Sequence, residues 1–99
     1  MSRCYQMDLT VRRYNPFCFK KIQKAAKEIF DFELEEVKMD DGKHAESTVD
    51  GNLCAGETEA EFAKRLKDVI FEANGGPCQI TLDAHDLDST PCESFTFGE

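Results

Sequence analysis

The hydrophobic pattern of this chain switches repeatedly between a period of two residues and a period of about 3.6 residues, and this order constrains the fold more than any other feature. Residues 4–12 alternate between apolar and polar side chains, which predicts a strand with one buried face. The apolar members of this alternation are Tyr5, Met7, Leu9 and Val11. Residues 78–85 alternate in the same way and predict another half-buried strand.

Two helices are expected from their capping signals. Asn15 followed by proline is typical of a helix start, and apolar residues at helical spacing continue to about Phe30. Thr58 and Glu61 form the sequence pattern of a capping box at the start of a second amphipathic helix. That helix is expected to end at residues 74–77, because the sequence Asn-Gly-Gly-Pro stops helical structure.

Between the helices the sequence predicts a hairpin of two acidic strands. The apolar residues Phe32 and Leu34 have even numbers, whereas Val37 and Met39 have odd numbers, so in a regular strand the two pairs would face opposite sides. Glu35 and Glu36 are therefore expected to form a β-bulge, whose extra residue would turn both pairs toward the core. Asp40, Asp41 and the glycine after them provide turn chemistry. The returning strand is expected within residues 43–54.

The resulting order of strand, helix, two strands, helix and strand is similar to the split βαβ sandwich of ferredoxin-like proteins. This resemblance implies an α+β domain over residues 1–86, with a four-stranded antiparallel sheet covered by two helices on one face. Residues 87–99 are expected to form either a mobile tail or a fifth strand at the sheet edge. The architecture hosts many unrelated functions, so the resemblance transfers no functional residue.

Charge is unevenly distributed along the chain, whose formal net charge is −8. Residues 1–30 carry seven basic and two acidic side chains, whereas residues 31–61 carry two basic and eleven acidic side chains. A chain of 99 residues has little room for both a core and a deep substrate cavity, which favours a shallow site or a binding surface. The acidic middle of the chain is expected to attract a basic partner.

We therefore predict a non-enzymatic binding protein that needs no cofactor and docks on a basic protein, which could itself bind nucleic acid. Small inhibitors, regulators, immunity proteins and phage-encoded antagonists have this kind of composition. The predicted partner-binding residues are seven carboxylates and one exposed aromatic residue on the second helix. They are Glu33, Glu35, Glu36, Asp40, Asp41, Glu46, Asp50 and Phe71.

Two other interpretations of these residues stay open. The carboxylates of a charge run often form only a solvated face, and Phe71 could be covered by the aromatic residues of the tail. A homodimeric regulatory domain, formed through a sheet edge or face and holding a small ligand, is the alternative function. Genuine binding by the acidic hairpin predicts an interaction that weakens steeply with salt, whereas a ligand domain predicts stabilisation by a metabolite.

A metal site is the remaining alternative, because Cys4, Cys54 and His85 are expected to gather at one end of the sheet. Thiolates and imidazole suit zinc, but the paired spacing of typical zinc ligands is missing. Cys18 lies near Arg12 and Arg13, which would favour a thiolate, although its place on an apolar stripe favours burial. The five cysteines are expected to be free thiols in a cytoplasmic protein, because the chain begins without an apolar export signal.

Direct nucleic-acid binding is not favoured. The first helix carries a basic face that could contact phosphates, but the acidic remainder of the chain opposes this. The residues of this face are Arg12, Arg13, Lys20, Lys21, Lys24 and Lys27. No apolar run approaches the length of a membrane-spanning helix, so no membrane partner is expected.

Overall fold

A five-stranded antiparallel sheet in the order β2-β3-β1-β4-β5 forms one layer of the protein. The computed structural model describes residues 3–39, 42–53, 58–86 and 93–98. The strands are β1 (Arg3–Arg12), β2 (Glu35–Met39), β3 (Gly42–Leu53), β4 (Gln79–Asp86) and β5 (Glu93–Phe97). The α+β class is therefore confirmed, and the C-terminal segment provides a fifth strand at the sheet edge.

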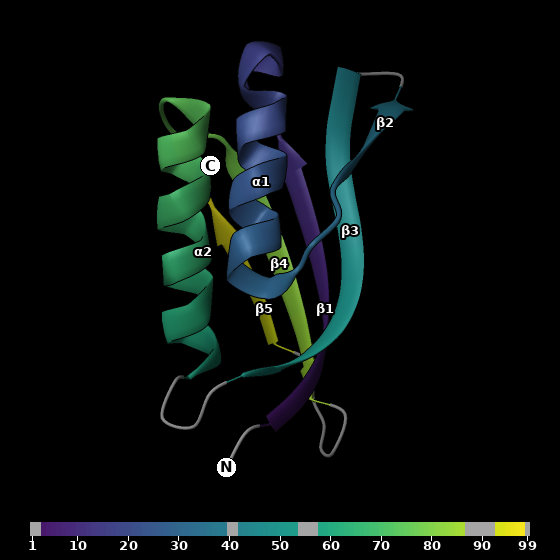
Figure 1. Cartoon of the computed structure of the whole chain (residues 1–99), viewed down its shortest axis with the longest axis vertical. Helices are drawn as coiled ribbons and strands as arrows, with labels where there is room; N and C mark the ends of the chain where they lie inside the picture. Colours follow the sequence, from purple (N-terminus) through teal and green to yellow (C-terminus); the bar gives the residue numbers. More distant parts are fainter. Residues whose placement is uncertain (1–2, 40–41, 54–57, 87–92, 99) are drawn as a thin grey trace.

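Two helices, α1 (Phe19–Phe30) and α2 (Glu59–Asn74), pack against each other and lie over the same side of the sheet (Figure 1). Each places an apolar stripe toward the sheet and charged residues toward solvent, as the helical spacing predicts. Neither of these described helices is long and apolar enough to cross a membrane.

The core lies between the helices and the sheet. The inward-facing residues of β1 are fully buried, and so are the residues beneath them on α1, α2 and β4. The largest of these side chains are Tyr5, Met7, Leu9, Ile22, Phe62, Leu66, Ile70, Ile80 and Leu82. Burial of a side chain of this size stabilises the fold by about 1.5–3 kcal/mol, so the alternation in β1 and the helical stripes together hold the two layers in contact.

The cap of the second helix agrees with its sequence signal. Thr58 Oγ1 accepts a hydrogen bond from Glu61 N–H at 3.1 Å, and the Glu61 side chain accepts one from Thr58 N–H at 3.2 Å. Gly75 ends the helix in the left-handed conformation. At the first helix the Asn15 side chain accepts a hydrogen bond from Phe17 N–H, as a cap should.

The first turn after Asn15 differs from the expectation. It is a short 3-10 helix (Pro16–Cys18), in which Cys18 N–H donates to Asn15 O at 2.8 Å, and α1 begins only at Phe19. Such tighter turns are common at helix N-termini. The buried side chain of Asn74 also accepts a hydrogen bond from Asn15 N–H at 2.6 Å, which ties the start of this turn to the end of α2.

The expected bulge in the first hairpin strand is wrong. β2 begins only at Glu35 and pairs residue for residue with β3 as far as Met39. Phe32 and Leu34 are buried, but they lie in an extended segment that precedes the strand. No extra residue turns the apolar side chains inward: Glu36 lies opposite the buried Ala45 on the inner face, and Val37 lies opposite His44 on the outer face. The predicted turn at Asp40 and Asp41 falls outside the described residues.

The last strand is held beside β4 by backbone pairing and by partial burial of its aromatic residues. Phe95 and Phe97 pack against the core, and Ser94 Oγ donates a hydrogen bond to Asp83 on β4. Gly98 follows with a φ angle of 78°. A Cβ atom at this position would collide with the backbone carbonyl oxygen of Cys78.

We predict that Gly98→Ala destabilises the protein by about 1–3 kcal/mol, because the added methyl group forces β5 away from the start of β4 and strains a left-handed backbone. The urea midpoint and amide hydrogen exchange in β5 measure this. Gly76→Ala is the matched control, since no heavy atom lies within 4 Å of an added Cβ there. Equal midpoints for the two variants would contradict the prediction.

Candidate functional site

An open concavity of about 590 Å³ lies on the sheet where β1, β3 and the segment leading into β2 come together. Five carboxylates line it, and the hydroxyl groups of Thr10, Ser47 and Thr48 lie among them. We call this site the acidic groove and define it by Asp8, Asp31, Glu33, Glu35 and Glu46. These carboxylates come from three separate segments of the chain, which are β1, residues 31–35 and β3, so the fold is needed to bring them together.

Strand parity places the first side of the acidic groove. Asp8 and Thr10 alternate with the buried residues of β1 and therefore face away from the core. Asp8 is paired with Thr48, and Thr10 with Glu46, on the neighbouring strand β3. The hydroxyl of Thr48 donates a hydrogen bond of 2.6 Å to Asp8 Oδ1, which fixes the direction of that carboxylate.

The segment between α1 and β2 provides the other side. Asp31 ends α1 in the left-handed conformation, with φ 59°, and turns the chain toward the sheet. Leu34 is buried, and its carbonyl oxygen accepts a hydrogen bond from Gln23 Nε2 at 2.8 Å. Glu33 N–H donates to Ser47 Oγ at 3.0 Å, which holds the segment against β3. The exposed carboxylates of Asp31 and Glu33 therefore stand beside β3 on a well-supported chain.

The negative charge of the acidic groove has little internal compensation. Glu35 and Glu46 lie directly opposite each other on β2 and β3. Histidines approach at two points: His44 Nε2 is 3.1 Å from Glu46 Oε2, and His85 Nε2 is 3.5 Å from Asp8 Oδ2. Among the side chains that the structure describes, no lysine or arginine forms a salt bridge with any of the five carboxylates.

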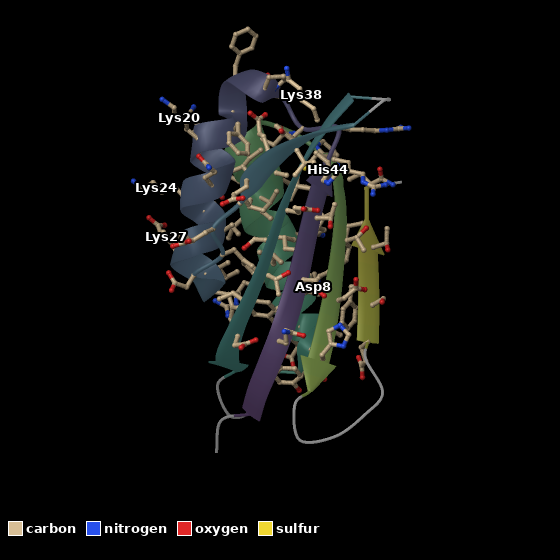
Figure 2. All side chains as sticks on the ribbon, turned by 90° about the vertical axis from the view of Figure 1, so that its right-hand side faces the viewer. Asp8, Lys20, Lys24, Lys27, Lys38 and His44 are labelled. Carbon is tan, nitrogen blue, oxygen red and sulfur yellow. The ribbon has the colours of Figure 1, made fainter. Side chains whose placement is uncertain are left out.

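Three exposed lysines of α1 lie on the helix side of the molecule. Lys20, Lys24 and Lys27 are exposed and project from α1 away from the outer sheet face that carries Asp8 (Figure 2). Lys27 lies one helical turn before Asp31, whose backbone N–H donates to Lys27 O at 2.8 Å, whereas Lys20 and Lys24 lie further back along α1. None of these three lysines forms a described salt bridge with a carboxylate of the acidic groove.

Glu36 does not belong to the acidic groove. It is paired with the buried residue Ala45, and its Oε2 accepts a hydrogen bond of 2.5 Å from the hydroxyl of Tyr14. Burial raises the pKa of Tyr14 well above its ordinary value, and the hydrogen bond and negative charge of Glu36 raise it further. Glu36 thus connects β2 to the turn before α1.

The other predicted partner-binding residues are placed apart from this site. Asp50 is exposed on β3 but does not line the acidic groove, and Asp40 and Asp41 lie outside the described residues. Phe71 is half-buried on α2, which contacts β4 and β5 at the far edge of the sheet. Lys67 Nζ lies 5.8 Å from the ring centroid of Phe71 and 5.7 Å from that of Phe97 on β5.

Sequence reasoning did not include Asp8 and Asp31 among the binding residues. Asp8 is isolated in sequence from the acidic hairpin, and its outward parity was the only signal for it. Asp31 directly follows a helix and could have been chosen because it begins the acidic run at residues 31–36. Tertiary structure was needed to show that both share a concavity with Glu33, Glu35 and Glu46.

The predicted metal ligands are only partly described. The backbone of Cys4 lies in β1, two residues from Gln6, which is paired with His85. The side chain of Cys4 and the whole of Cys54 lie outside the described residues, and the described part holds no group of three candidate metal ligands. The metal site therefore stays a prediction.

The described thiols offer little support for cysteine chemistry. Cys18 and Cys78 are free, and Cys18 is half-buried at the start of α1. Burial raises the pKa of Cys78 to about 11, so its thiol stays protonated at neutral pH.

Comparison of the chain with protein-family models, with curated proteins and with solved structures finds no match.

We predict that Glu36→Gln lowers the pKa of Tyr14, because the substitution removes a negative charge beside the phenol. The pKa should nevertheless stay above the ordinary value, because burial is the largest cause of the shift. An NMR titration of the Tyr14 ring up to pH 12 measures this, because the ring of the variant should begin to titrate at a lower pH than that of the natural chain. Glu35→Gln is the matched control, and an equal effect of both variants would contradict the assignment.

We also predict that Glu35→Gln stabilises the protein by about 0.2–1 kcal/mol at low salt, because it removes a like-charge pair across β2 and β3. The gain should shrink at high salt, where the repulsion is screened. Urea unfolding at 20 mM and 500 mM NaCl measures both effects. A loss of stability in the variant would show that the carboxylate has a structural role instead.

Proposed function

We propose that this chain is a small, non-enzymatic protein-binding module that acts as an inhibitor or regulator by docking its acidic groove on a basic partner. The observation that carries the proposal is the convergence of five carboxylates on one concavity without a described lysine or arginine among them. Solubility requires no such convergence. A partner that supplies lysine or arginine side chains would relieve the repulsion within the acidic groove.

The charge distribution supports a role in recognition. Like charges on facing strands cost stability, and the pair formed by Glu35 and Glu46 has this arrangement. An uncompensated acidic surface also attracts a basic protein over longer distances and raises the association rate. The same field opposes contact with phosphate groups, so the proposal does not include direct nucleic-acid or membrane binding.

The strand order supports a ferredoxin-like arrangement of β1 to β4, to which β5 is added beside β4. Function belongs to the individual site, so this arrangement alone assigns none. The free thiols of Cys18 and Cys78 would fit a reducing compartment such as the cytoplasm.

The test measures binding of a fluorescent ten-residue polylysine peptide to the full chain by anisotropy. At 20 mM NaCl we expect the double variant Glu33→Gln/Glu35→Gln to bind about tenfold more weakly than the natural chain, because two charges of the acidic groove are removed. Binding of the natural chain should also weaken steeply between 20 mM and 300 mM NaCl.

Glu28→Gln/Glu72→Gln is the matched control, because it changes the net charge equally on exposed helix positions. We expect this control to change the affinity by less than about twofold. If both double variants weaken binding equally, the peptide responds only to total charge and the acidic groove is not the docking site.

A further inference from the structure

Among the described residues, one edge of β3 has no pairing strand over half of its length. β1 pairs with β3 along residues 44–53, but β2 pairs with it only along residues 42–46. From Ser47 to Leu53, no described strand lies on the other side of β3. In Figure 1 the middle of β3 forms the right-hand border of the sheet, and the end of the strand curves to the left below the helices. An unpaired edge of this kind is a template for an added strand.

The register shows which backbone groups face this open edge. Met39 and Gly42 lie directly opposite each other, and only two residues separate them along the chain. In a hairpin this short, the last two opposite residues form the hydrogen-bonded kind of antiparallel pair. Every second residue of an antiparallel strand faces the same way, so the even-numbered residues of β3 face the β2 side. Thr48, Asp50 and Asn52 therefore direct their backbone N–H and C=O groups to the open edge.

The two faces beside this edge differ in chemistry. Thr48 and Asp50 have exposed side chains on the outer sheet face, close in sequence to Glu46 of the acidic groove. The opposite face at this edge is apolar, because Val49 is half-buried and the Phe30 ring lies over Gly51. An added strand would meet carboxylates on one of its faces and apolar groups on the other.

A second copy of this chain fits the edge poorly. Antiparallel pairing of two β3 edges about their centres would place Asp50 beside Asp50 of the other copy, and like charges directly opposite each other are destabilising. Each copy also carries a net charge of −8. Charge complementarity selects a basic segment instead.

We propose that this β3 edge, defined as residues 48–53, binds an extended basic segment of the partner by β-augmentation, an inference that rests on the function proposed above. Residues of the segment opposite Thr48 and Asp50 point their side chains to the outer face and are lysine or arginine. The residues between them are apolar and face Val49 and Phe30. The backbone of the edge supplies hydrogen bonds, and the acidic groove supplies charge selectivity.

The test uses a blocked seven-residue peptide of alternating lysine and valine, added to the full chain at 20 mM NaCl. Binding should slow amide hydrogen exchange at Thr48, Asp50 and Asn52, because their N–H groups become paired. N-methylation of two lysines should weaken binding at least about tenfold, since the lysine N–H groups face β3. N-methylation of two valines should change it by less than about twofold, because their N–H groups face solvent.

Two variants of the protein provide a second comparison. Asp50→Pro removes an outward N–H without removing a bond to β1, so it should weaken peptide binding more than Asp50→Asn, which removes only the charge. A heteronuclear NMR spectrum checks that both variants are folded. Equal binding by the two variants overturns the inference.

Other outcomes separate this inference from the proposed function. If the peptide binds without protecting the edge amides and both N-methylated forms bind equally, docking occurs by charge alone and only the inference is overturned. If neither this peptide nor polylysine binds at low salt, both are overturned. Protection of the edge amides that rises with protein concentration without peptide would show that a second copy is the occupant, against the inference.

Discussion

The pairing of β1 on both of its edges, with alternate residues buried, is the constraint on which the rest of the structure depends. Its odd-numbered residues from Tyr5 to Val11 are buried against the helices. Its even-numbered residues include Asp8 and Thr10, which line the acidic groove. A shift of one residue would exchange these two faces and bury a carboxylate, so the same register that forms the core also presents the site.

The different lengths of β2 and β3 connect the acidic groove to the open edge. β2 has five residues and β3 has twelve, because the chain leaving α1 enters the sheet only at Glu35. The preceding residues, which include Phe32 and Leu34, use their side chains for the core instead of pairing along β3. This late entry into the sheet places Asp31 and Glu33 beside β3, and from Ser47 onward no described strand pairs with that edge of β3.

Local signals predicted most of the fold because they depend on near neighbours. The capping box of Thr58 and Glu61 is satisfied within one turn, and the alternation in β1 requires only that one face be buried. The bulge at Glu35 and Glu36 was wrong because parity alone cannot distinguish an extra residue in a strand from an extended segment that precedes it. Hydrogen-bond pairing decides between these two, and pairing involves residues distant in the chain.

The sequence alone determined the two periods, the helix caps and the excess of carboxylates in residues 31–61, because these are properties of adjacent residues. Only the tertiary structure decided which carboxylates act together. Glu36 neighbours Glu35 in sequence but lies against Tyr14, whereas Asp8, far away in sequence, shares the acidic groove. The physical reason is that neighbouring strand residues face opposite sides of a sheet, while sheet pairing joins residues from separate strands on one face.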